Sequence, residues 1–162
     1  MVVALGSNLA DGYASSEALL EAALAAFPAA GLKVLARSRW WRSAAWPDPS
    51  GPEYRNGVVL VGAGGGPEAV LAALMTVEAR FNRRRGRRNA PRTLDLDLIA
   101  HGRQALATPE LTLPHPRAHE RLFVMGPLAE IAPAWRHPTL GRSAAELAAS
   151  ATVGRDAEPI TE

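Results

Sequence analysis

Residues 93–100 contain a clean alternation of polar residues and leucines, and this segment restricts the fold more than any other. Successive side chains of a β-strand point to opposite faces, so the alternation predicts a strand with one face in the core. Asp95 and Asp97 then project from the other face, with their backbones roughly 7 Å apart. The buried face would carry Leu94, Leu96 and Leu98.

The rest of the chain offers patterns that can build a sheet and its covering helices around this strand. Helical spacing of apolar residues predicts two helices, over 15–27 and 67–81. Further strands are expected over 2–5, 32–45 and 58–61. The order strand, helix, strand, strand, helix, strand predicts an α+β fold with a ferredoxin-like βαββαβ core. We expect a mostly antiparallel sheet with helices on one face, the other face free for ligands, and extra C-terminal elements.

Length and composition indicate an ordinary globular protein. The 162 residues suit a single domain over 1–162, with a frayed C-terminal tail over about 150–162. Ser143 and Glu146 have the spacing of a capping box for a last short helix. Cysteine is absent, no apolar run is long enough to cross a bilayer, and the N-terminus lacks the features of a signal peptide. We therefore expect a cytoplasmic protein without a membrane partner.

Seven arginines and no acidic residue lie between Arg80 and Arg92, although the formal net charge of the chain is only +2. The guanidinium group is permanently charged and can bind a phosphate through two hydrogen bonds. The cluster indicates a polyanionic partner. The number of arginines could also reflect a GC-rich genome, which explains their clustering less well.

Asp95 and Asp97 have the chemistry of a magnesium site, since Mg²⁺ is usually held by one or two carboxylates and by substrate phosphates. The alternative is that they form the solvated face of an amphipathic strand, although aspartate is depleted in strands. The neighbouring Arg92 and the arginine cluster favour the metal site. Transfer of a phosphoryl-type group needs such positioning and neutralisation of charge.

A further polar cluster follows over 114–123. His115 and His119 could bind zinc, but no third ligand of suitable spacing is evident. The simpler interpretation of His119 is a surface histidine. His115, between two prolines, could reach a phosphate together with Arg121. Phe123, taken alone, is more often a core residue than a ligand contact.

These motifs together resemble one family. The run Pro-Arg-Thr-Leu-Asp-Leu-Asp-Leu at 91–98, with 113–116 and 119–121, is similar to the 6-hydroxymethyl-7,8-dihydropterin pyrophosphokinases. Residues 6–8 and the pair at 54 and 56 also match. The resemblance covers residues 1 to about 140. It implies a monomeric, ferredoxin-like enzyme of folate biosynthesis that transfers the β,γ-pyrophosphate of ATP to the pterin's hydroxymethyl oxygen and releases AMP.

The resemblance also implies a role for each matching residue. Two magnesium ions would be bound by Asp95 and Asp97. The catalytic residues would be Arg83, Arg92, Asp95 and Asp97, with Arg83 on a mobile loop. The ATP site would comprise Glu78, Arg83, Arg85, Arg92, Leu98, Thr112, His115 and Arg121. The pterin site would comprise Ser43, Ala44, Trp46, Tyr54, Asn56 and Phe123. The chain departs from the family at Asn89-Ala90, where Trp-Gly is common, and its arginine loop is one residue shorter.

Two alternative hypotheses assign the chain to different classes of protein. An RNA-binding module could also combine a ferredoxin-like sheet with an arginine loop, but such modules stack bases on exposed strand aromatics. Residues 93–100 offer carboxylates instead, so no nucleic-acid partner is expected. A nucleotidyltransferase could use the same Asp-x-Asp arrangement, but it would release pyrophosphate rather than AMP.

Overall fold

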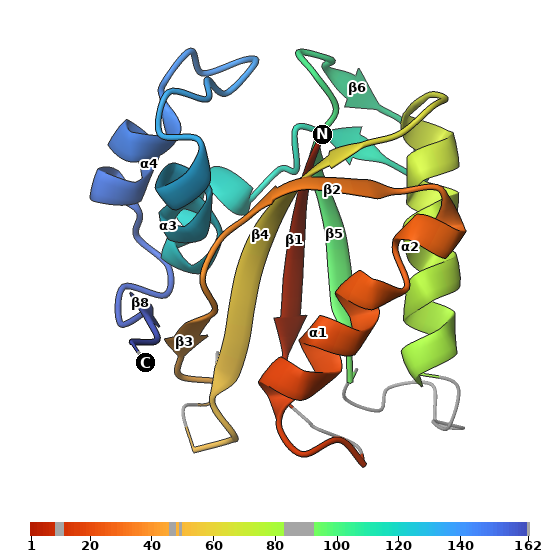
Figure 1. Ribbon diagram of the computed structural model, residues 1–162. Helices are drawn as coiled ribbons and strands as arrows, with labels where there is room; N and C mark the ends of the chain where they lie inside the picture. Colours follow the sequence, from red (N-terminus) through yellow and green to blue (C-terminus); the bar gives the residue numbers. More distant parts are fainter. Residues whose placement is uncertain (9–11, 46–47, 49, 83–92, 162) are drawn as a thin grey trace.

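The computed structural model describes residues 1–8, 12–45, 48, 50–82 and 93–161 (Figure 1). Within these residues, a six-stranded sheet has the order β5-β1-β4-β3-β8, and β2 also pairs with β4. Its strands are β1 (Val2–Ser7), β2 (Lys33–Arg37), β3 (Trp41–Ser43), β4 (Tyr54–Gly62), β5 (Asp95–Ala100) and β8 (Glu158–Pro159). A small hairpin is formed by β6 (Leu106–Ala107) and β7 (Thr112–Leu113). All pairings within the two sheets are antiparallel.

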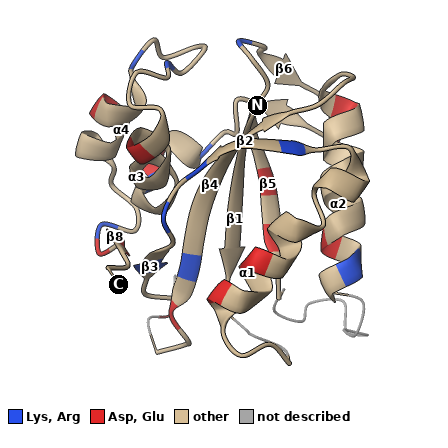
Figure 2. Cartoon of the chain, in the orientation of Figure 1, with Lys and Arg blue, Asp and Glu red and all other residues tan. Residues whose placement is uncertain are grey.

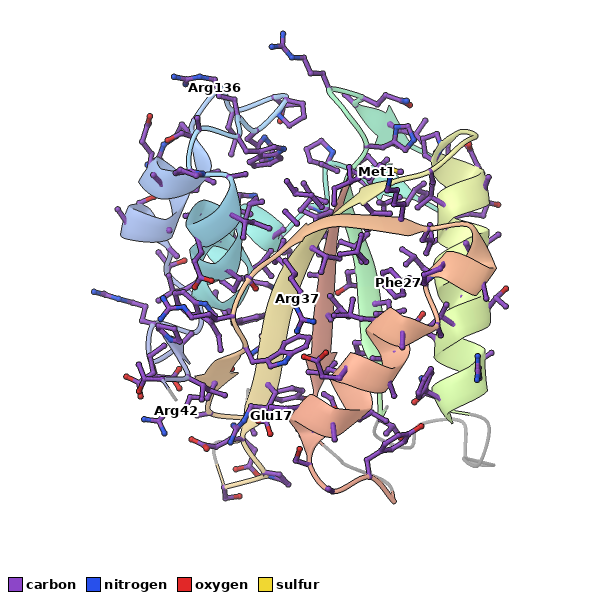
Figure 3. All side chains as sticks on the ribbon, viewed as in Figure 1. Met1, Glu17, Phe27, Arg37, Arg42 and Arg136 are labelled. Atoms are coloured by element: carbon purple, nitrogen blue, oxygen red, sulfur yellow. The ribbon has the colours of Figure 1, made fainter. Side chains whose placement is uncertain are left out.

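One face of the sheet is covered by α1 (Ser16–Ala25) and α2 (Pro67–Asn82). The Ser15 side chain caps α1 by accepting a hydrogen bond from the Ala18 amide at 3.0 Å. The core beneath these helices is apolar because every second side chain of β1, β4 and β5 points into it. Phe27, just after α1, is fully buried there (Figure 3). The helices predicted over 15–27 and 67–81 are therefore confirmed.

Part of the opposite face is also covered by helices. The prediction placed helices on one face only. Here α3 (Leu122–Ile131) packs on β4 and β3, and α4 (Ala144–Ser150) packs on α3. A second apolar cluster joins residues of the sheet, such as Val58 and Ile99, to Met125 and Leu128 of α3. Ser143 caps α4 as predicted, since its hydroxyl accepts the Glu146 amide at 3.1 Å.

The strand predicted over 32–45 is divided into β2 and β3. Ser38 causes the interruption, because its hydroxyl accepts the hydrogen bond of the Val58 amide at 3.0 Å. Its own amide donates to the Val58 carbonyl at 2.9 Å. Trp40 then lies against Gly57, where any Cβ atom would overlap its ring. The Ser38 hydroxyl therefore accepts the hydrogen bond that a backbone carbonyl would accept in a regular pair of strands.

The prediction of a frayed tail over 150–162 was wrong for the described part of that segment. Glu158–Pro159 form β8, which pairs with Trp41 and Arg42 of β3. The Ile160 amide donates to the Trp40 carbonyl at 2.9 Å. A two-residue strand with a proline has no alternation by which the sequence could reveal it.

Among the described residues, none of the helices has the length and apolar character needed to span a membrane.

Candidate active site

A cavity of about 190 Å³ lies on the face of the sheet that α3 partly covers, next to the start of this helix. Its floor is formed by β1, β4 and β5, and its walls by the end of β3 and the start of α3. The predicted site residues among its lining are Ser43, Ala44, Tyr54, Asn56, Asp95, Asp97, Arg121 and Phe123. The structure thus brings both predicted carboxylates and most predicted pterin contacts to one place.

Small residues of β1 make room for the floor of this cavity. Gly6 pairs with Asn56 on one side and with Asp95 on the other. A Cβ atom at Gly6 would lie 3.3 Å from the Asn56 side-chain oxygen, so glycine permits the close approach. Ala4 holds the equivalent position beside Asp97. Figure 2 shows acidic residues on β5 and no charge on β1. The small residues Ala4 and Gly6, at alternate positions of the first strand, are the sequence signal from which this open floor could be predicted.

The start of β5 and the two residues before it are held by two side chains at the end of α2. Asn82 accepts hydrogen bonds from the Thr93 and Leu94 amides at 2.8 and 3.1 Å, and its amide donates to the Leu94 carbonyl at 2.9 Å. Glu78, one turn earlier, accepts from the Leu96 amide at 3.1 Å. Asp95 lies between the residues that are held in this way. Glu78, expected in the ATP site, therefore contacts the backbone of the carboxylate strand.

The two carboxylates suit magnesium better than a transition metal. Asp95 is half-buried and Asp97 is exposed, and both line the cavity. In the part of the chain that the structure describes, no group of three His, Cys, Asp or Glu side chains could hold a metal ion. Two carboxylates with space for phosphate oxygens match the partial coordination typical of Mg²⁺.

The wall opposite β5 is built from polar and aromatic groups. The buried Asn56 amide donates to the Ser43 hydroxyl at 3.0 Å, which joins β4 to the end of β3. Tyr54 pairs with Ser43 across the two strands. Phe123 enters from the first turn of α3, and the Arg121 guanidinium lies 5.8 Å from its ring centroid. The cavity therefore has aromatic side chains and hydrogen-bonding groups within one small volume.

Other residues expected to bind ATP lie around a neighbouring hollow. Thr112 and His115 line a space of about 430 Å³ together with His119 and His137. His119 is partly buried rather than a free surface residue, and its ring meets His137 edge-on at 5.5 Å. Leu98 has its side chain in the core beneath α1 and α2, so only its backbone could contact a ligand.

His115 is held in one orientation. Its amide donates to the Ile99 carbonyl at 2.8 Å, and its ring Nδ1 accepts from the Arg117 amide at 3.2 Å. Burial lowers the pKa of the imidazole below the ordinary 6.5, and the nearby Asp97 opposes that shift. A neutral ring with an accepting Nδ1 carries its proton on Nε2. His115 can then offer Nε2–H to a phosphate oxygen.

Four predicted site residues lie outside the described residues, namely Trp46, Arg83, Arg85 and Arg92.

Comparisons with known proteins agree on one family. Residues 2–133 match the family described as 7,8-dihydro-6-hydroxymethylpterin-pyrophosphokinase (HPPK). The chain is 41% identical over 147 residues to the 2-amino-4-hydroxy-6-hydroxymethyldihydropteridine pyrophosphokinase of Synechocystis sp., covering 90% of this chain and 73% of that relative. It is 39% identical over 152 residues to the protein of the same name from Pseudomonas aeruginosa, with coverages of 91% and 89%.

The fold is also found among solved structures. A crystal structure of Plasmodium falciparum HPPK-DHPS matches with a TM-score of 0.66 at 12% sequence identity, covering 91% of this chain. The present chain spans 43% of that longer protein.

Proposed function

The chain belongs to the 7,8-dihydro-6-hydroxymethylpterin-pyrophosphokinase family, and we propose that its reaction takes place in the cavity between β3, β5 and α3. It is an enzyme of folate biosynthesis that transfers pyrophosphate from ATP to hydroxymethyldihydropterin. This location rests on one observation: the same cavity is lined by Asp95, Asp97, Tyr54, Asn56 and Phe123.

The chemistry is a displacement at the β-phosphorus of ATP. The hydroxymethyl oxygen of the pterin bonds to this phosphorus and loses its proton. The bond from the phosphorus to the oxygen that bridges to the α-phosphate breaks, and AMP leaves with that oxygen. The products are AMP and the pterin diphosphate. Such a transfer depends on alignment and on charge neutralisation, because no covalent intermediate with the protein is needed.

Magnesium is the cofactor used in this family. Asp95 and Asp97 support a site for two ions, because their carboxylates project from the same face of β5 into the cavity. Bound magnesium would neutralise phosphate charge. The protein itself supplies Arg121 at the cavity and the Nε2–H of His115 beside it. Arg83, Arg85 and Arg92 would add phosphate contacts, with Arg83 and Arg92 assisting the transfer.

The adenosine part of ATP would occupy the hollow next to the carboxylates. Thr112 is exposed at this hollow, and Leu98 could contribute its backbone from the adjacent strand. Glu78 supports the site from behind by holding the Leu96 amide.

The pterin ring would lie between Tyr54 and Phe123. Aromatic pairs contribute about 0.5–1.5 kcal/mol beyond simple burial. Asn56 would hydrogen-bond the ring, since its amide has one more N–H and a carbonyl oxygen besides the group that contacts Ser43. The backbone edge at Ser43, Ala44 and Trp46 would recognise the polar side of the pterin.

The topology, domain organisation, oligomeric state and location that we propose are those expected for this family. The strand order β5-β1-β4, with β2 and β3 beyond β4, supports a ferredoxin-like core. We assign a single domain, a monomeric state and a cytoplasmic location to the protein.

The test is to identify the products from Mg-ATP and 6-hydroxymethyl-7,8-dihydropterin. We expect equal amounts of AMP and pterin diphosphate, and no product when the divalent cation is removed with EDTA. Release of pyrophosphate instead of AMP would identify a nucleotidyltransferase and overturn the proposal.

A further inference from the structure

The segment 152–159 follows the matched residues 2–133 in the sequence and connects two walls of the proposed pterin site. We propose that Gly154 and Asp156 in this segment are positioning residues for the pterin: Gly154 through Phe123, and Asp156 through Ala44. This inference rests on the proposed function of the cavity and extends it to residues beyond the family match.

The segment first attaches to the turn that starts α3. The Thr152 and Val153 amides both donate to the Glu120 carbonyl, at 3.0 and 2.9 Å. The Leu122 amide donates to the Val153 carbonyl at 2.9 Å. These bonds lie on both sides of Arg121, the residue that precedes α3. Arg121 and Phe123 therefore reach the cavity from a backbone that the C-terminal segment holds in place.

Gly154 then lies directly against the Phe123 ring. Its φ of +68° is in the left-handed region, which favours glycine. A Cβ atom built at Gly154 would overlap the ring at Cδ1 and Cε1. Because the ring is backed by a residue without a side chain, it can lie deep in the wall. Any larger residue at 154 would push Phe123 toward the cavity.

The same segment attaches to the opposite wall two residues later. Asp156 accepts a hydrogen bond from the Ala44 amide at 2.6 Å, just after the end of β3. Glu158 pairs with Arg42, whose Nε donates to it at 2.8 Å. Figure 3 labels Arg42 at the side of the sheet where β3 and β8 meet. Since Asp156 uses the Ala44 N–H, the carbonyl is the backbone group of Ala44 that remains for a ligand.

One short stretch of chain thus contacts both the aromatic wall and the backbone edge. Gly154 and Asp156 are two positions apart, so a shift of this segment would change the spacing between Phe123 and Ala44. A flat ring needs close contact with its aromatic partner and aligned hydrogen bonds at its edge. ATP should depend on this spacing much less, because its proposed contacts lie mainly on β5 and near His115, and Arg121 alone shares the wall with Phe123.

The first experiment compares Gly154→Ala with Gly141→Ala. Gly141 has nearly the same φ, +70°, but a Cβ atom there would meet nothing within 4 Å. Both variants bear the same backbone strain, and only the first disturbs Phe123. We expect Gly154→Ala to raise the Kd and KM for the pterin about tenfold, with ATP affinity changed less than about twofold. Gly141→Ala should retain wild-type values for both ligands.

The second experiment compares Asp156→Ala with Asp156→Asn. The alanine variant leaves the Ala44 amide without its acceptor, and we expect a rise of about three- to tenfold in the pterin KM. Asparagine keeps an oxygen at this position, so Asp156→Asn should recover most of the loss. A general loss of folding would lower binding of both ligands, whereas a positioning role affects the pterin alone.

Two outcomes would overturn the inference while the wild-type enzyme still forms AMP and pterin diphosphate. The first is unchanged pterin affinity in both Gly154→Ala and Asp156→Ala. The second is an equal loss of ATP and pterin binding in these variants with their melting temperatures preserved. If the wild-type protein itself does not bind the pterin, the proposed function fails instead, and the two failures are thereby distinguished.

Discussion

Asp97 is an exposed residue between two buried leucines, so its carboxylate contributes to the cavity rather than to the core. We expect Asp97→Ala to reduce kcat at least about 100-fold, because metal-assisted charge stabilisation is worth several kcal/mol. The free energy of unfolding should change little. Steady-state kinetics and urea denaturation measure the two quantities. Glu68→Ala removes an exposed acid from α2 and serves as the control, with activity within about twofold of wild type.

The aromatic side chains at the cavity should discriminate between the two substrates. Phe123→Ala and Tyr54→Ala are each expected to weaken pterin binding about tenfold, since each removes one stacking partner. Neither side chain lies in the hollow assigned to the adenosine, so ATP binding should stay within about twofold. Calorimetry with each ligand separately measures both affinities. Equal losses for ATP and pterin would show that the pterin lies elsewhere.

At the scale of the elements, the position of β5 depends on the end of α2. Asn82 makes three hydrogen bonds to the backbone of residues 93 and 94. Asn82→Ala should cost about 1–3 kcal/mol of unfolding free energy, because it removes these three hydrogen bonds from partly buried backbone groups. It should also raise the magnesium concentration needed for half-maximal activity, since the residues just before Asp95 are held less firmly, although Glu78 and the pairing with β1 remain.

Asn82→Asp is the matched comparison, because it keeps the oxygen that accepts from the two amides, while its second oxygen replaces the donor that faces the Leu94 carbonyl. We expect it to fall between wild type and Asn82→Ala in both measurements. A magnesium requirement that is the same in all three proteins would contradict this positioning role.

An element could be predicted from the sequence when its own residues show a periodic pattern of apolar side chains. The alternation at 93–100 and the helical spacing at 67–81 identified β5 and α2 correctly. Asn56 and Tyr54 were assigned to the site through the family resemblance, and the structure places them in the cavity. The segment 152–159 has no such pattern, because its order comes from contacts with distant residues. Its contribution to the cavity could therefore be seen only in the structure.

At the scale of the whole molecule, acid should weaken the fold through buried histidines. Burial lowers the pKa of His137 below 6.5, and the neighbouring His119 contributes to this shift. The unfolded chain therefore binds protons at a pH where the folded protein does not. The stability that this histidine contributes is present above about pH 6.5 and is lost as the pH falls through its folded pKa. His115 should contribute in the same direction.

His137→Asn tests this pH dependence. The ring Nδ1 accepts from the Thr139 and Leu140 amides at 3.3 and 3.1 Å, and the asparagine side-chain oxygen can take over this role. Urea denaturation between pH 5 and 8 should show a shallower decline for the variant than for the wild type. Because His115 and His119 are present in both proteins, the difference between the two profiles reports on His137. Parallel profiles would contradict the assignment.

The pairing of β8 with β3 has a consequence for when the protein becomes competent during its synthesis. Arg42 and Glu158 are 116 positions apart, so their contact is among the most distant in the chain. Every strand that forms the cavity floor has left the ribosome well before the segment 152–159 does. Contacts of such long range are expected to form late in folding. A nascent chain can therefore assemble β1, β4, β5 and the metal carboxylates first, and gain the completed pterin wall only once the segment 152–159 has emerged.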